Sequence, residues 1–121
     1  MAEKKEKKVR TIRTVVVPAR ELARVEGIPD TVEALQEIVG GHFEMIMLDK
    51  DTALICNEEG KLNSLEANAA LYDEDGTLID VIFGDFLLCR VKGEDLAGFS
   101  ETEAVQVLEN MLLRPRILIR H

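Results

Sequence analysis

The sequence predicts an α+β domain in which an antiparallel sheet of about five strands carries two helices packed on one face. Three observations support this fold class. Several β-branched or apolar runs are bounded by turn residues, as strands are. Two segments place apolar residues at helical spacing. Strands of this kind need a covered face, which the two helices supply. The 121 residues suffice for one core, so we expect a single domain over residues 10–121 behind a disordered, charged tail at 1–9.

The expected strands follow from apolar patterning and turn signals. Residues 19–28 fit either a helical turn or a short extended piece, 62–72 read as irregular or partly extended, and 92–99 as a loop. A glycine inside an apolar run suggests a bulge or bend, so Gly84 predicts one. The segments expected to form strands are 10–17, 43–48, 52–57, 77–91 with its interruption at Gly84, and 116–120.

The first helix is expected between Pro29 and a glycine pair. Asp30 with Glu33 three residues later has the pattern of a capping box. Gly40 offers the left-handed residue that ends a helix, and Gly41 frees the following turn. Because the pair follows a helix instead of opening one, it predicts a helix stop and not a phosphate-binding loop.

The second helix is expected to begin after Ser100, which forms a second capping box with Glu103. Its apolar stripe consists of Ala104, Val107, Leu108, Met111 and Leu112, and Arg114-Pro115 is expected to end it. The basic, alternating segments 10–17 and 116–120 are expected at sheet edges, where charged side chains discourage aggregation.

Composition excludes several classes of protein. Aromatic residues make up 4% of the chain and Trp is absent, which argues against base-stacking surfaces. No apolar run has the ~18 residues of a membrane span, and we expect a cytoplasmic protein. Cys56 and Cys89 lie in apolar surroundings and are interpreted as reduced, buried thiols. Two Cys and two His without ligand spacing predict no metal or cofactor site.

The net charge of −8 is unevenly distributed. Residues 1–20 carry +5 and residues 114–121 carry +3, which leaves −16 on residues 21–113. An acidic body between two basic ends favours a basic partner surface over direct binding of nucleic acid.

Five residues are candidates for a binding site: Glu44, Asn57, Asn68, Asp80 and Asp85. Asp80 and Asp85 flank Gly84, and inward-pointing carboxylates there would signal a site or a bend, whereas outward alternation also explains Asp80.

The other three candidates also leave two interpretations open. Glu44 shares a strand face with His42, either as an acid–base pair or as a surface pair. Asn57 and Asn68 fit backbone-bonding roles or contacts to a ligand. We assign no catalytic residue.

Four motifs follow one another along the chain: Ile38-Val39-Gly40-Gly41 before Phe43-Glu44, the turn Asn57–Leu62 with Gly60, Asn68-Ala69-Ala70-Leu71, and Asp80–Phe86 with Gly84. Their order resembles the DUF3846 family, a small domain of unknown function found mostly in phages, plasmids and integrated elements of Gram-positive bacteria. The resemblance spans about residues 12–113. Ala67 stands where the family often has proline, and the basic C-terminal segment is extra. The family brings no known reaction or cofactor, so the resemblance implies a genomic setting.

These observations favour a non-enzymatic accessory protein of a mobile element. Its partner would be a protein, or a second copy through self-association, and its acidic body would meet a basic surface, by mimicking nucleic acid in an anti-defence role. One alternative is an oligomer that binds a small molecule such as a nucleotide signal. Another is nucleic-acid binding through the basic ends, which the net charge opposes. No membrane partner is expected.

Overall fold

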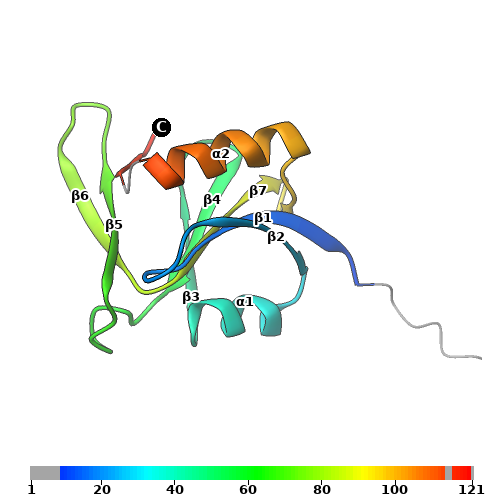
Figure 1. Ribbon diagram of the computed structural model, residues 1–121, viewed down its shortest axis with the longest axis horizontal. Coiled ribbons are helices and arrows are strands. Elements are labelled where there is room, and N and C mark those ends of the chain that lie inside the picture. The colour runs from blue at the N-terminus through cyan, green and yellow to red at the C-terminus, as the bar shows by residue number, and fades with distance from the viewer. Residues whose placement is uncertain (1–8, 114–115, 121) are drawn as a thin grey trace, which may run out of the picture.

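The computed structural model describes residues 9–113 and 116–120 and confirms an α+β fold (Figure 1). The tail expected at 1–9, apart from Val9, and the helix break at Arg114-Pro115 lie outside the described residues. The strands are β1 (Thr11–Val17), β2 (Arg24–Pro29), β3 (Phe43–Met47), β4 (Thr52–Asn57), β5 (Ala67–Tyr72), β6 (Leu78–Phe83), β7 (Phe86–Lys92), β8 (Asp95–Ala97) and β9 (Arg116–Leu118). The helices are α1 (Val32–Val39) and α2 (Glu101–Leu113).

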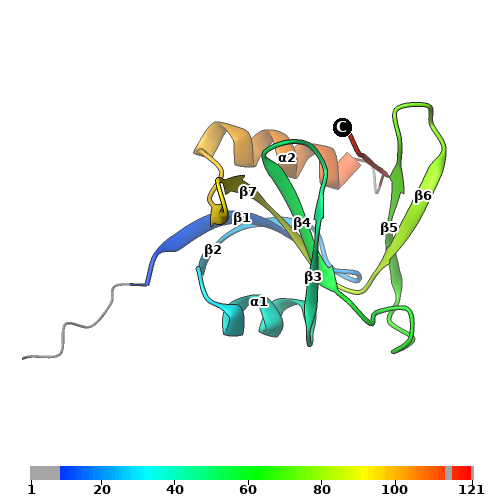
Figure 2. The ribbon, with the colours of Figure 1, turned by 180° about the vertical axis from the view of Figure 1, so that it is seen from behind.

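The strands form two sheets. The main sheet is antiparallel and has the order β2-β1-β7-β4-β3, with β8 added to β7. The number of strands in this path agrees with the expected sheet, but its members differ, because β2 belongs to it whereas β6 and β9 lie in the second sheet. The second sheet, β6-β5-β9, was not expected, and in it β9 runs parallel to β5. It stands beside the end of the main sheet (Figures 1 and 2).

The two helices lie on opposite faces of the main sheet, so the prediction of one shared face is wrong (Figure 1). On one face, Leu35 of α1 belongs to a buried cluster with Ile55 and Leu87. On the other, Ala104 of α2 belongs to a cluster with Leu54 and Leu88. The physical reason lies in β4 and β7. Their apolar runs are continuous instead of alternating, as in strands that are buried on both sides, so each face needs its own cover.

The second sheet shares the α2 side of the molecule. Leu71, Ile82 and Ile117 from its three strands join the cluster that contains Phe86 and Ala104. The chain passes from β6 into β7 through Gly84, whose φ is +87°. The expected bend at this glycine is therefore confirmed, and it is the point where the chain leaves one sheet for the other.

The start of α1 differs from the expectation by one residue. Thr31, not Asp30, is the N-cap, and its hydroxyl oxygen accepts a hydrogen bond from the Ala34 amide at 3.1 Å. Asp30 instead forms an ion pair with Arg10 at 2.7 Å. The end of the helix is as expected, because Gly40 has the left-handed φ of +81° and donates to the carbonyl of Gln36.

The capping box of α2 is confirmed. The Glu103 amide donates to the Ser100 hydroxyl at 3.1 Å, and the Ser100 amide donates to the Glu103 carboxylate at 2.9 Å. Arg90 of β7 also donates to Glu103 at 2.6 Å and lies over the Phe99 ring. The Ser100 amide first, and Arg90 second, lower the pKa of Glu103.

Three segments form strands that the sequence pattern did not predict, because it left their conformation open or indicated a loop. Residues 24–29 and 67–72 are extended, and residues 95–97 form a short strand within the expected loop. The expectation that residues 10–17 lie at an edge is wrong, because β1 pairs with β2 on one side and β7 on the other. Its inner position follows from the burial of Val15 and Val16 on opposite faces. The segment 116–120 does contribute an edge strand, β9, to the second sheet.

Candidate functional site

Asn57 holds the end of α1 against β4. Its side-chain amide donates to the Val39 carbonyl at 3.1 Å, and its side-chain oxygen accepts from the Glu59 amide at 2.8 Å. The residue is 8% exposed. Both ends of its amide are occupied by backbone, so the backbone-bonding interpretation applies. Asn57 also lies close to Gly41, where an added Cβ would stand 3.2 Å from the Asn57 Nδ2.

Asn68 joins the two sheets. Its side-chain amide nitrogen donates to the carbonyls of Val17 and Gly84, each at 2.9 Å. Val17 ends β1 of the main sheet, Asn68 lies in β5 of the second sheet, and Gly84 is the bend between β6 and β7. The backbone-bonding interpretation again applies, and the contact is a tertiary one that the sequence pattern did not specify.

Glu44 and Asp80 lie on exposed stretches of strand. The Glu44 carboxylate accepts a weak hydrogen bond from the Cys56 thiol at 3.8 Å. Burial, followed by the charge of Glu44, raises the pKa of Cys56 to about 12. Asp80 accepts a hydrogen bond from the Val81 amide at 2.8 Å. Among the hydrogen bonds of the described residues, none joins His42 to Glu44.

Asp85 lines two cavities, of about 440 Å³ and 590 Å³, and Asn68 lines a smaller one of about 170 Å³. Asp85 follows the Gly84 bend, and its carboxylate accepts from the Ala19 amide at 2.8 Å. The five predicted residues do not form one site. Asn68 bonds the Gly84 carbonyl beside Asp85, whereas Glu44 and Asp80 both lie near enough to Cys56 for their charges to raise its pKa. The glycines act structurally: Gly60, for instance, packs so closely that an added Cβ would stand 2.7 Å from the Phe83 carbonyl oxygen.

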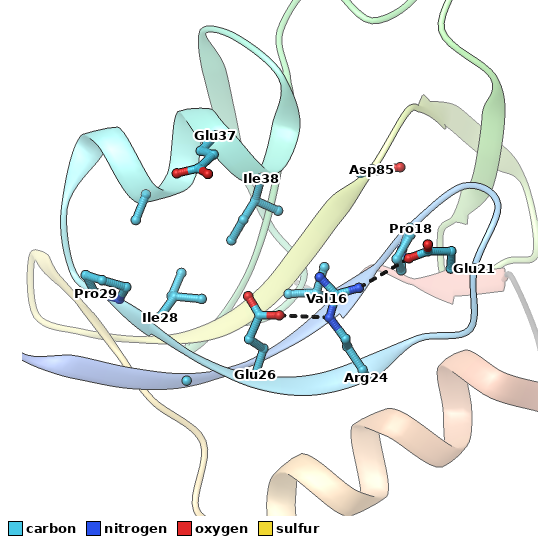
Figure 3. Close-up of a pocket in the computed structure, with 12 residues that line it drawn as sticks. Val16, Pro18, Glu21, Arg24, Glu26, Ile28, Pro29, Glu37, Ile38 and Asp85 are labelled. Carbon is cyan, nitrogen blue, oxygen red and sulfur yellow. Dashed lines mark hydrogen bonds and ion pairs between the residues drawn. The ribbon is translucent and has the colours of Figure 1, made fainter.

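The cavity lies between α1 and the β1–β2 hairpin and has a volume of about 440 Å³ (Figure 3). Val16, Ile28 and Ile38 supply apolar lining, with Ile38 coming from the helix and the other two from the strands. Figure 3 shows Glu37 on the helix side and Glu26 with Arg24 on the strand side. The full lining is Val16, Pro18, Glu21, Arg24, Glu26, Gly27, Ile28, Pro29, Ala34, Glu37, Ile38 and Asp85.

A second cavity of about 590 Å³ continues the first around the end of α1. The two share Pro18, Glu21, Glu37, Ile38 and Asp85, and we call them together the α1 groove. The added part is lined by residues from three places: Ala19 and Arg20, Val39 and Gly40, and Ser64, Leu65, Glu66 and Gly84.

Carboxylates outnumber cations in the α1 groove. Arg24 donates to Glu26 at 2.8 Å and lies 3.7 Å from Glu21. The hydrogen bond that Arg24 donates to Glu26 is the largest of the effects that raise the pKa of Arg24.

Arg20 is likewise paired, with Glu66 at 3.1 Å. Within the described part of the chain, Glu37 and Asp85 take part in no ion pair, so the groove keeps a negative excess.

Sequence reasoning missed most of this groove. Glu21, Glu26 and Glu37 lie in separate elements and share no motif. The one signal that bears on them is the acidic excess of residues 21–113, which has no positional information. They line one cavity because α1 packs on β3, β4 and β7 of the sheet and so lies beside the β1–β2 hairpin, which is a tertiary arrangement.

Among residues 9–113 and 116–120, no cluster of three or more His, Cys, Asp or Glu side chains is arranged to hold a metal ion. In the same residues, neither helix has the length and apolarity needed to cross a bilayer.

The fold and the groove define a small two-sheet α+β domain with an acidic cleft beside its shorter helix. The chain belongs to the DUF3846 family, a domain of unknown function, whose family model matches residues 12–112. No curated protein and no solved structure matches the chain.

Proposed function

We propose that this chain is a non-enzymatic binding protein whose α1 groove receives a basic segment of a partner protein. The observation that carries the proposal is the composition of the first cavity: four carboxylates, from Glu21, Glu26, Glu37 and Asp85, face one cation, Arg24. Two of these carboxylates, on Glu37 and Asp85, have no ion-pair partner among the described residues. A cation entering the groove would find them available.

The apolar lining supports the same class of partner. Lys and Arg side chains combine an apolar stem with a charged head. In the α1 groove, the stem would pack against the half-buried Ile38, above the buried Val16 and Ile28, while the head meets a carboxylate near the opening. Complementary charge of this kind raises the rate of association and weakens with salt.

Membership of the DUF3846 family supports a proposal about the genomic setting in which the protein acts. We propose that the protein is an accessory protein of a phage, plasmid or other mobile element and acts in the cytoplasm. There its acidic body would imitate nucleic acid toward a basic host protein, such as a defence nuclease. The asymmetry of charge, −16 over residues 21–113, supports this role.

A charge-reversal experiment tests the proposal. The tagged chain, Glu37→Lys and Glu109→Lys are used to capture proteins from host lysate at low and high salt. Glu37 is exposed in the last turn of α1 and lines the groove, whereas Glu109 is an exposed residue of α2 on the opposite face of the sheet. A lysine near a helix C-terminus is compatible with the helix dipole, so Glu37→Lys is expected to fold.

We expect a basic partner that is captured by the wild type and by Glu109→Lys, is lost with Glu37→Lys, and is released by salt. Equal capture by all three proteins, or capture that is indifferent to salt, would reject the groove as the binding site. A turnover that disappears in His42→Ala or Asp80→Ala would reject the non-enzymatic role.

A further inference from the structure

The strand β3 forms an open end of the main sheet. Within the described residues, β4 is the strand that pairs with it. The Glu58 amide donates to the His42 carbonyl, and the Leu48 amide donates to the Thr52 carbonyl. Because antiparallel hydrogen bonding alternates along a strand, the even-numbered residues of β3 bond to β4. The backbone groups of Phe43, Met45 and Met47 therefore point outward.

The strand at the other edge of the main sheet, β2, is protected against pairing with a further strand. The Asp30 amide donates to the Arg10 carbonyl, so by the same alternation Val25, Gly27 and Pro29 present their backbones outward. Pro29 has no N–H to offer, and both proline and glycine weaken strand pairing. No proline, glycine or lysine interrupts the outward positions of β3. Natural edge strands usually carry such protection when they are meant to stay unpaired.

We propose that β3 pairs antiparallel with β3 of a second copy of this chain, about a two-fold axis at Met45. In this register, Phe43 lies opposite Met47 of the second copy, and Met45 lies opposite itself. All three outward-pointing residues then exchange N–H and C=O groups with their counterparts. The two main sheets become one continuous sheet.

The side chains favour a second copy over a foreign strand. Phe43 and Met47 pack on the α1 face, and Met45 lies between them on the same side of the strand and is 49% exposed. The two-fold register places the two Met45 side chains against each other. Glu44 faces Ile46 of the second copy, so no like charges lie directly opposite.

The position of β3 in the molecule leaves its outer edge open to a second copy. Figure 2 shows β3 on the near side, in front of β4, with no other element drawn over it. None of the β3 residues lines the α1 groove. The pairing is therefore separate from the proposed partner site, and either can fail without the other.

A proline scan of the two edges tests the pairing. Met45→Pro removes an outward N–H that β4 does not use, so proline is compatible with the isolated fold. Val25→Pro removes the equivalent outward N–H on β2 and is the matched control. Mass is measured by light scattering and by sedimentation over a series of concentrations, with circular dichroism and thermal unfolding to check the fold. We expect twice the 13.5 kDa chain mass for the wild type and Val25→Pro, and the single-chain mass for Met45→Pro.

Cross-linking supplies a measurement that does not depend on Met45→Pro folding. Directly opposed residues in a hydrogen-bonded antiparallel pair have Cα atoms about 5.5 Å apart, within the range that a disulfide spans. Oxidation of Met45→Cys is expected to give a covalent dimer, and Val25→Cys is expected to stay single. The native Cys56 and Cys89 are buried and do not compete under native conditions.

The outcomes separate cleanly. A concentration-dependent dimer that Met45→Pro abolishes, or a Met45→Cys cross-link without one at Val25→Cys, supports the pairing. A single-chain mass at every concentration overturns it. So does a folded Met45→Pro that remains dimeric, or a Met45→Cys protein that does not cross-link.

Discussion

The side-chain amide of Asn68 donates a hydrogen bond to the Gly84 carbonyl at 2.9 Å. The same nitrogen donates to the Val17 carbonyl. One side chain thus fastens the second sheet both to the end of β1 and to the bend through which the chain enters β7. Because Asp85 of the α1 groove follows that bend directly, this contact positions part of the candidate site.

Replacing Asn68 is expected to loosen the junction between the sheets. Asn68→Ala removes the side-chain donor from two partly buried carbonyls, and we expect the free energy of unfolding to fall by about 1–3 kcal/mol. Urea unfolding measures the loss. Asn63→Ala, at an exposed position in the loop before β5, is the control and should change stability by less than about 0.5 kcal/mol. Equal effects of the two changes would show that the Asn68 contacts contribute nothing.

Gly84→Ala is expected to destabilise the protein for two reasons. The φ of +87° strains any residue with a Cβ, and the added Cβ would stand 2.7 Å from Leu65 Cδ1. Gly76→Ala shares the strain, with φ +79°, but meets nothing within 4 Å. We expect about 1–2 kcal/mol for the strain alone in Gly76→Ala and a larger loss for Gly84→Ala. If chemical denaturation shows the larger loss of stability for Gly76→Ala, the close contact with Leu65 adds nothing to the cost of the backbone strain at Gly84.

Thr31→Ala is expected to fray the first turn of α1, because the Thr31 hydroxyl is the acceptor for the Ala34 amide. Loss of such a cap costs about 1 kcal/mol. Hydrogen exchange followed by NMR should show faster exchange of the Ala34 amide in Thr31→Ala. In Asp30→Ala, which breaks the ion pair with Arg10 instead, the same amide should keep its protection. Loss of Ala34 protection in Asp30→Ala alone would restore Asp30 as the cap.

The buried thiols predict a loss of stability at alkaline pH. Burial raises the pKa of Cys56 and of Cys89 from 9.0 to about 12. Between these values the unfolded chain releases thiol protons that the folded chain retains, so the free energy of unfolding falls as pH rises. Below pH 9.0 the contribution is fully present.

Urea unfolding at a series of pH values measures this slope. The double variant Cys56→Ala/Cys89→Ala lacks both thiols and should show a shallower decline above pH 9.0. Identical slopes in the two proteins would assign the alkaline loss to other groups. The native protein should also resist maleimide labelling at neutral pH, since both thiols are 2% exposed or less.

Local signals in the sequence were sufficient for several parts of the fold. The stop at Gly40 depends on the freedom of one residue to adopt a left-handed backbone. The capping box of Ser100 and Glu103 joins residues within one turn. The bend at Gly84 follows from a glycine inside an apolar run. In each case the interacting groups lie close together in the chain, so their pattern is visible without the fold.

Other features depend on contacts between distant segments. The choice between Asp30 and Thr31 as the cap depends on Arg10, which lies just before β1 and forms an ion pair with Asp30. The identification of a binding surface failed for the same reason. Asn57 and Asn68 satisfy distant backbone carbonyls, and the groove acids Glu26 and Glu37 meet only across β2 and α1.

The sequence by itself determined the α+β class, the ends of the helices at Gly40 and Ser100, the bend at Gly84, the acidic body and the family. The tertiary structure decided that the helices cover opposite faces, that a second sheet forms around β5, and that the α1 groove is acidic. The physical reason is the distance along the chain over which each kind of interaction acts. Capping, turn conformation and apolar periodicity act over a few residues, whereas the placement of α1 and α2 depends on which faces of β4 and β7 remain to be buried once all the strands have paired.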